Sequence, residues 1–122
     1  MNNYALKDRT KKFAVEVIKL SSQLPNKQVG WVISKQIIRS STSVAANYRA
    51  VNRAKSDRDF ISKMGTVIEE SDDTLFWLEL IKDLDLGVEQ AQLDKLINEA
   101  NQLTAIFVSS IKTFKARLNK SS

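Results

Sequence analysis

Cysteine and histidine are both absent from this sequence of 122 residues. Without cysteine the chain has no disulfide, no thiolate ligand for zinc and no cysteine nucleophile. Without histidine it lacks the commonest general base near neutral pH, and it lacks the Glu-x-x-His pairs that bind iron in di-iron helical bundles. These absences argue against an enzyme and predict a protein that needs no metal and no cofactor.

Turn-forming residues and long apolar runs are scarce. Three glycines and one proline leave few turns, so most residues must belong to long elements. Charged side chains interrupt every apolar stretch before it reaches membrane-spanning length, and no export signal is visible near Met1. We therefore expect a cytoplasmic protein with no membrane contact, folded as one domain over residues 1–122.

Apolar residues recur along four segments with the 3.6-residue period of an α-helix. The short connections between these segments predict an all-α fold, an antiparallel up-down-up-down four-helix bundle with long helices. The second helix is expected to be the long one, on the order of 40 Å, with hydroxyl residues in its middle that could bend it. The expected helices are residues 4–23, 28–54, 57–85 and 88–118.

The ends of these helices carry recognisable signals. Pro25 makes further helix unfavourable after the first segment. Ser56 followed by Asp57 and Asp59 is typical of a helix start, because a hydroxyl can cap the first turn and carboxylates favour the positive end of the helix dipole. Gly87 is expected to end the third helix in a left-handed conformation.

Two of the expected helices carry more apolar side chains than one bundle core needs. A helix that is apolar on both faces is buried on both faces. The second face is either covered within the protomer or forms an interface between copies, and exposed aromatic residues on a monomer would favour aggregation. We expect a homo-oligomer whose interface contains Trp31, Ile38, Phe76, Trp77, Leu80 and Leu84.

Charge is distributed unevenly along the chain, whose net charge is +5. Residues 1–55 hold eleven basic and two acidic side chains, and residues 56–99 hold four basic and twelve acidic ones. The last part of the chain adds four basic residues and no acidic one. Four cations of the expected second helix share an arc of roughly 80° at 100° per residue. They are Lys35, Arg39, Arg49 and Arg53.

This row of cations, with Lys55 after it, has three interpretations. Arginines on a rigid helix suit nucleic-acid phosphates, because each guanidinium makes a forked contact and each neutralised phosphate releases counterions. The row could instead face carboxylates of the third helix, or it could be a solvated face. The sequence leaves these alternatives open. Under the first, the nucleic-acid-binding residues are Lys35, Arg39, Arg49, Arg53 and Lys55.

Three polar residues fall at the edges of core stripes, namely Asn47, Lys63 and Glu70. Such side chains are partly buried and need partners, which favours a structural polar network that fixes how the helices align. Glu70 is expected to reach a basic residue of the second helix. The acidic residues near Glu70 do not predict a metal site, because side chains on one rigid helix do not converge as loop ligands do.

Three segments resemble a known family of bacterial proteins. They read "RTKKFAVEVIKL", "QIIRSSTSVAANYRAVNRAKSDRDFISKM" and "EESDDTLFWLEL", in order along residues 6–84. They are similar to the four-helix bundle proteins encoded in intervening sequences of 23S ribosomal RNA genes. The chain differs from one branch of that family, which reads "NIAEG" where this sequence has Tyr48-Arg49-Ala50 after the asparagine.

The resemblance implies a barrel-like homopentamer without catalytic activity. Related accessory proteins of diversity-generating retroelements are similar basic pentamers that engage a reverse transcriptase and nucleic acid. Two functions follow as expectations. One is a non-enzymatic oligomer that binds structured, rRNA-associated RNA through a basic helix face. The alternative is an adaptor that docks a protein partner such as a reverse transcriptase. Neither uses a small-molecule substrate.

Sequence-specific binding of single strands is not expected. Aromatic side chains that could stack on unpaired bases are not interleaved with the row of cations, except near Trp31. RNA or DNA held by its backbone is the better form of the nucleic-acid hypothesis, and structured RNA is the preferred ligand.

Overall fold

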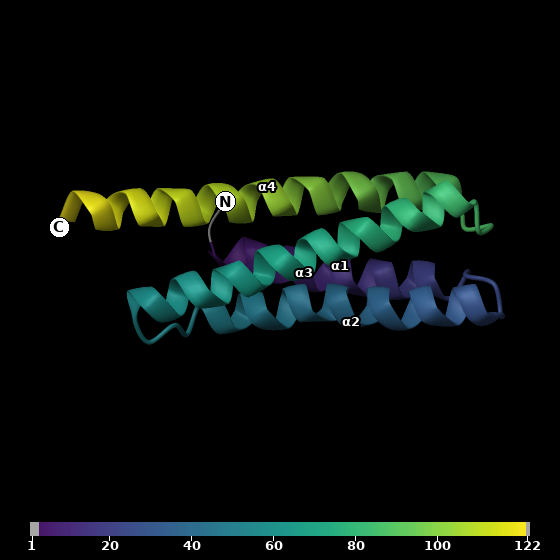
Figure 1. The fold of residues 1–122 in the computed structure, drawn as a ribbon, viewed down its shortest axis with the longest axis horizontal. Helices are drawn as coiled ribbons and strands as arrows, with labels where there is room; N and C mark the ends of the chain where they lie inside the picture. The colour runs from purple at the N-terminus through teal and green to yellow at the C-terminus, as the bar shows by residue number, and fades with distance from the viewer. Residues whose placement is uncertain (1–2, 122) are drawn as a thin grey trace.

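A computed structural model describes residues 3–121, and these form four α-helices joined by short connections (Figure 1). Successive helices run in opposite directions, and each packs against its neighbours in the order α1, α2, α3, α4, with α4 returning to α1. The predicted antiparallel up-down-up-down bundle is confirmed. Met1, Asn2 and Ser122 belong to the expected domain but lie outside the described residues. The helices are α1 (Asn3–Ser21), α2 (Gln28–Val51), α3 (Asp57–Leu84) and α4 (Gln90–Ser121).

The start of α3 follows its sequence signal. Ser56 has an extended backbone, and its side-chain oxygen accepts a hydrogen bond from the Asp59 backbone N–H at 3.1 Å. The end of α3 differs from the prediction, because the left-handed residue that terminates the helix is Asp85, with φ 50°. Gly87 also has a positive φ, 80°, but it lies within the connection to α4.

The expectation that the second helix is the long one is wrong. Among the described residues α2 has 24 residues and α4 has 32. Helix α2 ends at Val51. Beyond it, the backbone N–H groups of Arg53 and Ala54 donate to the carbonyls three residues earlier, as in a turn. Arg53 therefore lies in the turn between α2 and α3 instead of on the helix, and Lys55 lies in the same turn.

Hydroxyl groups in the middle of α2 bond back to its own backbone, as expected. The side chains of Ser40, Ser41 and Thr42 donate to carbonyls three or four residues earlier, and α2 continues through this segment without a break. Two further hydroxyl contacts cross between helices. Thr74 donates to the Ser40 hydroxyl at 2.9 Å. A second hydroxyl pair joins α3 to α4 at 2.6 Å, between Ser71 and Thr104.

One apolar core joins the helices, and it has one aromatic contact inside it and a second at its edge. The rings of Tyr48 and Phe107 lie 5.7 Å apart, and those of Phe60 and Phe114 lie 4.2 Å apart. Burial of the core residues supplies the main stabilising free energy of the fold. They are Leu6, Phe13, Val17, Leu20, Ile33, Ile37, Val44, Tyr48, Val51, Met64, Val67, Leu78, Ile81, Leu93, Leu96, Ala100, Leu103 and Phe107.

The connection between α1 and α2 packs directly on the second helix. Gly30 is buried in the first turn of α2, and a Cβ atom built there would lie 1.9 Å from the Pro25 carbonyl oxygen. A glycine is required at this position because the backbone of the connection occupies the space of a side chain.

Within residues 3–121 no helix is both long enough and apolar enough to cross a membrane.

Candidate nucleic-acid interface

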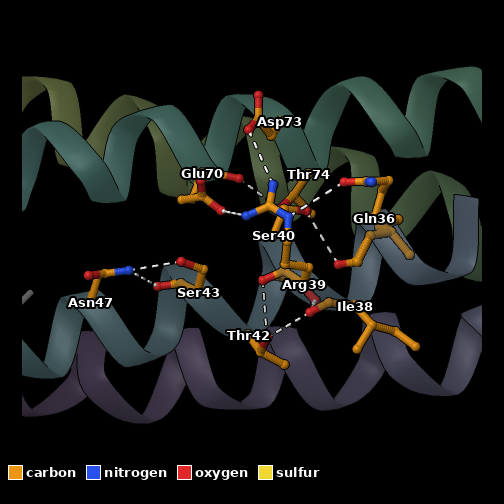
Figure 2. Close-up of polar contacts among 12 residues, drawn as sticks. Gln36, Ile38, Arg39, Ser40, Thr42, Ser43, Asn47, Glu70, Asp73 and Thr74 are labelled. Atoms are coloured by element: carbon orange, nitrogen blue, oxygen red, sulfur yellow. Dashed lines mark hydrogen bonds and ion pairs between the residues drawn. The ribbon is translucent and has the colours of Figure 1, made fainter.

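Arg39 is held by carboxylates of α3 (Figure 2). Its Nη1 donates to the Glu70 carboxylate at 2.9 Å, and its Nη2 lies 3.7 Å from the Asp73 carboxylate. The Glu70 side chain is only 15% exposed, whereas the Arg39 side chain is 52% exposed. The carboxylates neutralise this arginine within the protomer, which is the second of the three interpretations of the row.

Arg49 and Arg53 have a different environment. Together with Ala46, Ala50 and Lys63 they line a shallow, open hollow at the α2–α3 face. Both arginines are exposed, and neither guanidinium forms an ion pair with a carboxylate of residues 3–121. The small alanine side chains between them leave both guanidinium groups open to a ligand from solvent.

The predicted row is therefore divided by the structure into separate parts. Lys35 is exposed on α2 and forms no ion pair within the described chain. Arg39 is paired with α3, and only Arg49 and Arg53 share one hollow. Lys55 lies in the following turn, where its backbone N–H donates to the Asp59 carboxylate at 3.0 Å.

The three residues predicted to form a polar network are partly buried, but they do not meet one another. Asn47 donates to the backbone and side-chain oxygens of Ser43, both at 2.8 Å and both within α2. Lys63 donates to both Asp59 carboxylate oxygens at 2.6 Å within α3. Of the three, Glu70 makes the contact between helices, with Arg39. This is the contact expected between Glu70 and a basic residue of the second helix.

Lys63 and the Lys55 backbone both act on Asp59. The hydrogen bond from the Lys63 ammonium is the main cause that lowers the pKa of Asp59, and the Lys55 backbone N–H adds to it. Both favour the ionised carboxylate. Asp59 thus partly offsets the charge of Lys63, which lines the hollow. The other two cations that line the hollow, Arg49 and Arg53, have guanidinium groups without a carboxylate partner in the described residues.

The side chains predicted for the oligomer interface fall into two groups. Trp31, Phe76 and Leu84 are strongly exposed, at 60%, 56% and 48% respectively. The other three, Ile38, Trp77 and Leu80, are partly buried and pack against the core of their own protomer. The exposed group leaves apolar surface on both α2 and α3.

Two ion pairs between elements were not anticipated from the sequence. Arg9 of α1 forms a forked contact with Glu99 of α4, with Nε at 2.8 Å and Nη2 at 2.6 Å from the carboxylate oxygens. This hydrogen bonding raises the pKa of Arg9 above its ordinary value. Lys82 of α3 donates to Asp94 of α4 at 2.8 Å, and the bond lowers the pKa of Asp94.

A sequence signal for the first of these pairs does exist. Arg9 and Glu99 each precede a buried residue, and their helices are neighbours in a closed four-helix order. No group of three or more Asp or Glu side chains that could hold a metal ion is found in residues 3–121.

The comparisons with known proteins agree with this fold. The family model described as 23S rRNA-intervening sequence protein matches residues 2–109. A similar solved structure is a crystal structure of a protein with unknown function from the S23 ribosomal protein family of Bacteroides thetaiotaomicron VPI-5482. It has a TM-score of 0.81 and 35% sequence identity, and the similarity covers 92% of this chain and 99% of that chain. No curated protein matches.

Proposed function

The chain belongs to the 23S rRNA-intervening sequence protein family, and we propose that it is a non-enzymatic oligomer that binds structured RNA by its phosphate backbone. The RNA would contact the hollow lined by Arg49 and Arg53. The family name supports the expectation that the RNA is ribosomal RNA. Binding ribosomal RNA would place the protein in the cytoplasm.

The observation that carries the proposal is the difference in pairing between Arg39 in the middle of α2 and the two arginines at its end and in the following turn. Arg39 already has carboxylate partners, whereas Arg49 and Arg53 present unpaired guanidinium groups around one hollow. A guanidinium presents a planar set of donors that suits a phosphate, and release of counterions from RNA favours the contact.

The chemistry of the hollow favours a backbone contact over base recognition. The residues that line it are alanines and cations, without an aromatic ring on which a base could stack. A double-stranded or folded RNA presents phosphates continuously and needs no stacking partner. The proposed ligand is therefore structured RNA, bound with little preference for sequence.

The proposed oligomer rests on the exposed apolar side chains and on the family resemblance, which implies five copies. Trp31 and Phe76 would be covered by a neighbouring copy, because burial of large apolar side chains favours association. Light scattering after size exclusion tests this. We expect Trp31→Ser/Phe76→Ser to lower the oligomer mass. Val15→Ser/Ile18→Ser, which removes exposed apolar side chains from α1, is the matched control.

RNA binding is tested by fluorescence anisotropy with a labelled RNA hairpin at several salt concentrations. Wild-type affinity should fall steeply with salt, and Arg49→Glu/Arg53→Glu should lower the affinity at least about 100-fold through charge reversal at phosphate contacts. The matched control is Lys12→Glu/Lys95→Glu. It changes the net charge equally, but its residues line a hollow between α1 and α4, away from the α2–α3 face.

Equal losses in the two double variants would contradict a defined site and would point to general charge attraction. A wild-type protein that fails to bind RNA but binds a reverse transcriptase, or an acidic protein partner, would support the adaptor function instead. Loss of oligomer mass in Arg49→Glu/Arg53→Glu would show that these arginines hold subunits together, and the proposed RNA surface would then be wrong.

A further inference from the structure

The last turns of α4 extend beyond the rest of the bundle. In Figure 1 the yellow end of α4 continues along the long axis past the turn that joins α2 to α3. Residues 110–121, the part of α4 that contains these turns, are named the α4 extension here. It carries four basic residues, and no acidic residue occurs anywhere after Glu99. The basic residues are Lys112, Lys115, Arg117 and Lys120.

The α4 extension is attached to the bundle by aromatic packing. The Phe114 ring lies 4.2 Å from the Phe60 ring in the first turns of α3. Ile111, one turn earlier, packs against the apolar core. These contacts hold the helix axis in place, so the lysines that follow are presented on an ordered helix.

The same contacts bring the extension to the basic turn between α2 and α3. Phe114 lines one hollow together with residues 51–52 and 54–57, which include Lys55. Arg53 belongs to the same turn and lines the other hollow, the one that it shares with Arg49. The cations of the α2–α3 turn and of α4 therefore gather at one end of the bundle, although they are some 60 residues apart in the sequence.

The lysines of the extension are not neutralised by carboxylates of their own protomer within the described residues. Lys112, Lys115 and Lys120 are exposed, and none forms an ion pair with a carboxylate of residues 3–121. Cations near a helix C-terminus do favour the helix dipole, but that effect is confined to the last turn. Lys112 and Lys115 lie before it.

The extension also lies outside the part of the chain that the family model matches, which ends at residue 109. Its charge thus adds to the shared four-helix fold. At 100° per residue, Lys115 and Lys120 point about 140° apart around the helix axis. Cations on more than one side of a projecting helix suit a polyanion that passes along it, and they do not suit a single flat patch of carboxylates.

We propose that the α4 extension is a second RNA contact, which with Arg53 and Lys55 of the α2–α3 turn holds the phosphate backbone at this end of the bundle. The inference rests on the proposed RNA-binding function and adds a contact that the basic row of α2 does not contain. RNA bound at Arg49 and Arg53 continues onto the extension, so that both groups of cations bind one RNA molecule.

The test measures anisotropy of a labelled RNA hairpin with Lys115→Gln/Lys120→Gln over a range of salt. We expect affinity to fall about 10-fold at moderate salt, and the slope of log affinity against log salt to decrease by about 2, one for each lysine. Lys12→Gln/Lys95→Gln is the matched control, with the same charge change on the α1–α4 hollow. It should leave the slope unchanged. Circular dichroism and light scattering check the fold and the oligomer mass of each variant.

An unchanged slope in Lys115→Gln/Lys120→Gln, while Arg49→Glu/Arg53→Glu still abolishes binding, would overturn the extension contact and leave the proposed function standing. A fall in oligomer mass with RNA affinity retained would also overturn it, because the extension would then bind a second copy of this chain. Failure of the wild-type protein to bind the hairpin would refute the proposed function, and this inference with it.

Discussion

The middle of the bundle and the end that holds the α2–α3 turn are built differently, both inside and on the surface. In the middle, hydroxyls of Ser40 and Thr74 meet in the core, and Arg39 above them is paired with acidic residues of α3. Toward the turn, the core contact is aromatic, between Tyr48 and Phe107. The surface arginines there have no carboxylate partner within the described residues.

The comparison shows that the basic residues predicted to form one row differ in role: Arg39 forms an ion pair within the protomer, whereas Arg49 and Arg53 face solvent. Polar groups in the middle are used within the protomer, where they fix the alignment of α2 against α3. At the turn, apolar aromatic packing supplies the stability and leaves the guanidinium groups of Arg49 and Arg53 available to a ligand.

The largest effect is expected from breaking the aromatic region. Phe107 is fully buried, so Phe107→Ala removes its packing with Tyr48 and leaves a cavity. We expect the free energy of unfolding to fall by about 3–5 kcal/mol in urea denaturation at fixed protein concentration. Val32→Ala, at an exposed position of α2, is the control and should cost less than about 0.5 kcal/mol. Equal losses of unfolding free energy in the two variants would show that the packing of Phe107 does not stabilise this region.

A smaller effect is expected from the hydroxyl pair in the middle. Thr74→Val removes the donor to Ser40 and leaves a buried hydroxyl without that hydrogen bond, which should cost about 1–2 kcal/mol in the same denaturation measurement. The double variant Ser40→Ala/Thr74→Val removes both partners and should cost less than the sum of the single changes. Strict additivity would mean that the two hydroxyls do not interact.

Comparing single arginine variants sharpens the difference between the two regions. Arg39→Gln should lower the free energy of unfolding by up to about 1 kcal/mol, because it breaks a half-exposed ion pair with Glu70. Arg49→Gln should change it by less than about 0.5 kcal/mol. RNA affinity, measured by anisotropy, should fall more in Arg49→Gln than in Arg39→Gln. If Arg39→Gln weakens RNA binding more than Arg49→Gln does, the assignment of roles is reversed.

The smallest effect concerns pH at the turn. The pKa of Asp59 is lowered in the folded protein, so the carboxylate contributes stability above its unfolded value near pH 4, and the contribution is lost as pH falls through the folded pKa. Carboxyl titration by NMR should show this pKa, and Lys63→Gln should raise it. Asp94, paired with Lys82, should keep its lowered pKa in that variant. A common shift of both would indicate a change of the whole fold.

Much of the fold could be predicted from the sequence because apolar period, capping and the scarcity of turns all indicate the same structure. The ends of helices were less predictable. Residues 52–54 are compatible with a helix. The structure instead ends α2 at Val51, with a turn whose N–H groups bond to the Ala50 and Val51 carbonyls and which leads to Ser56, the cap of α3. That end places Arg53 in a turn and not on a helix face.

The division of the basic row could be anticipated only as alternatives. Whether Arg39 meets Glu70 depends on the alignment of α3 along α2, and the length of the turn and the packed core determine that alignment. A count of charges on one helix contains no information about which residues lie opposite. The Arg9–Glu99 pair was missed for the same reason, since it joins α1 to α4 across 90 positions of sequence.

Gly30 limits how this protein can change by mutation. Any substitution adds a Cβ atom where the Pro25 carbonyl already lies, so it must displace the connection and with it the first turn of α2. Gly65 within α3 has no atom within 4 Å of such a Cβ, and alanine there would also reduce the flexibility of the unfolded chain. Two glycines in helices of one bundle thus differ in whether a side chain can be added, and the tolerance of each position follows from what that side chain would touch.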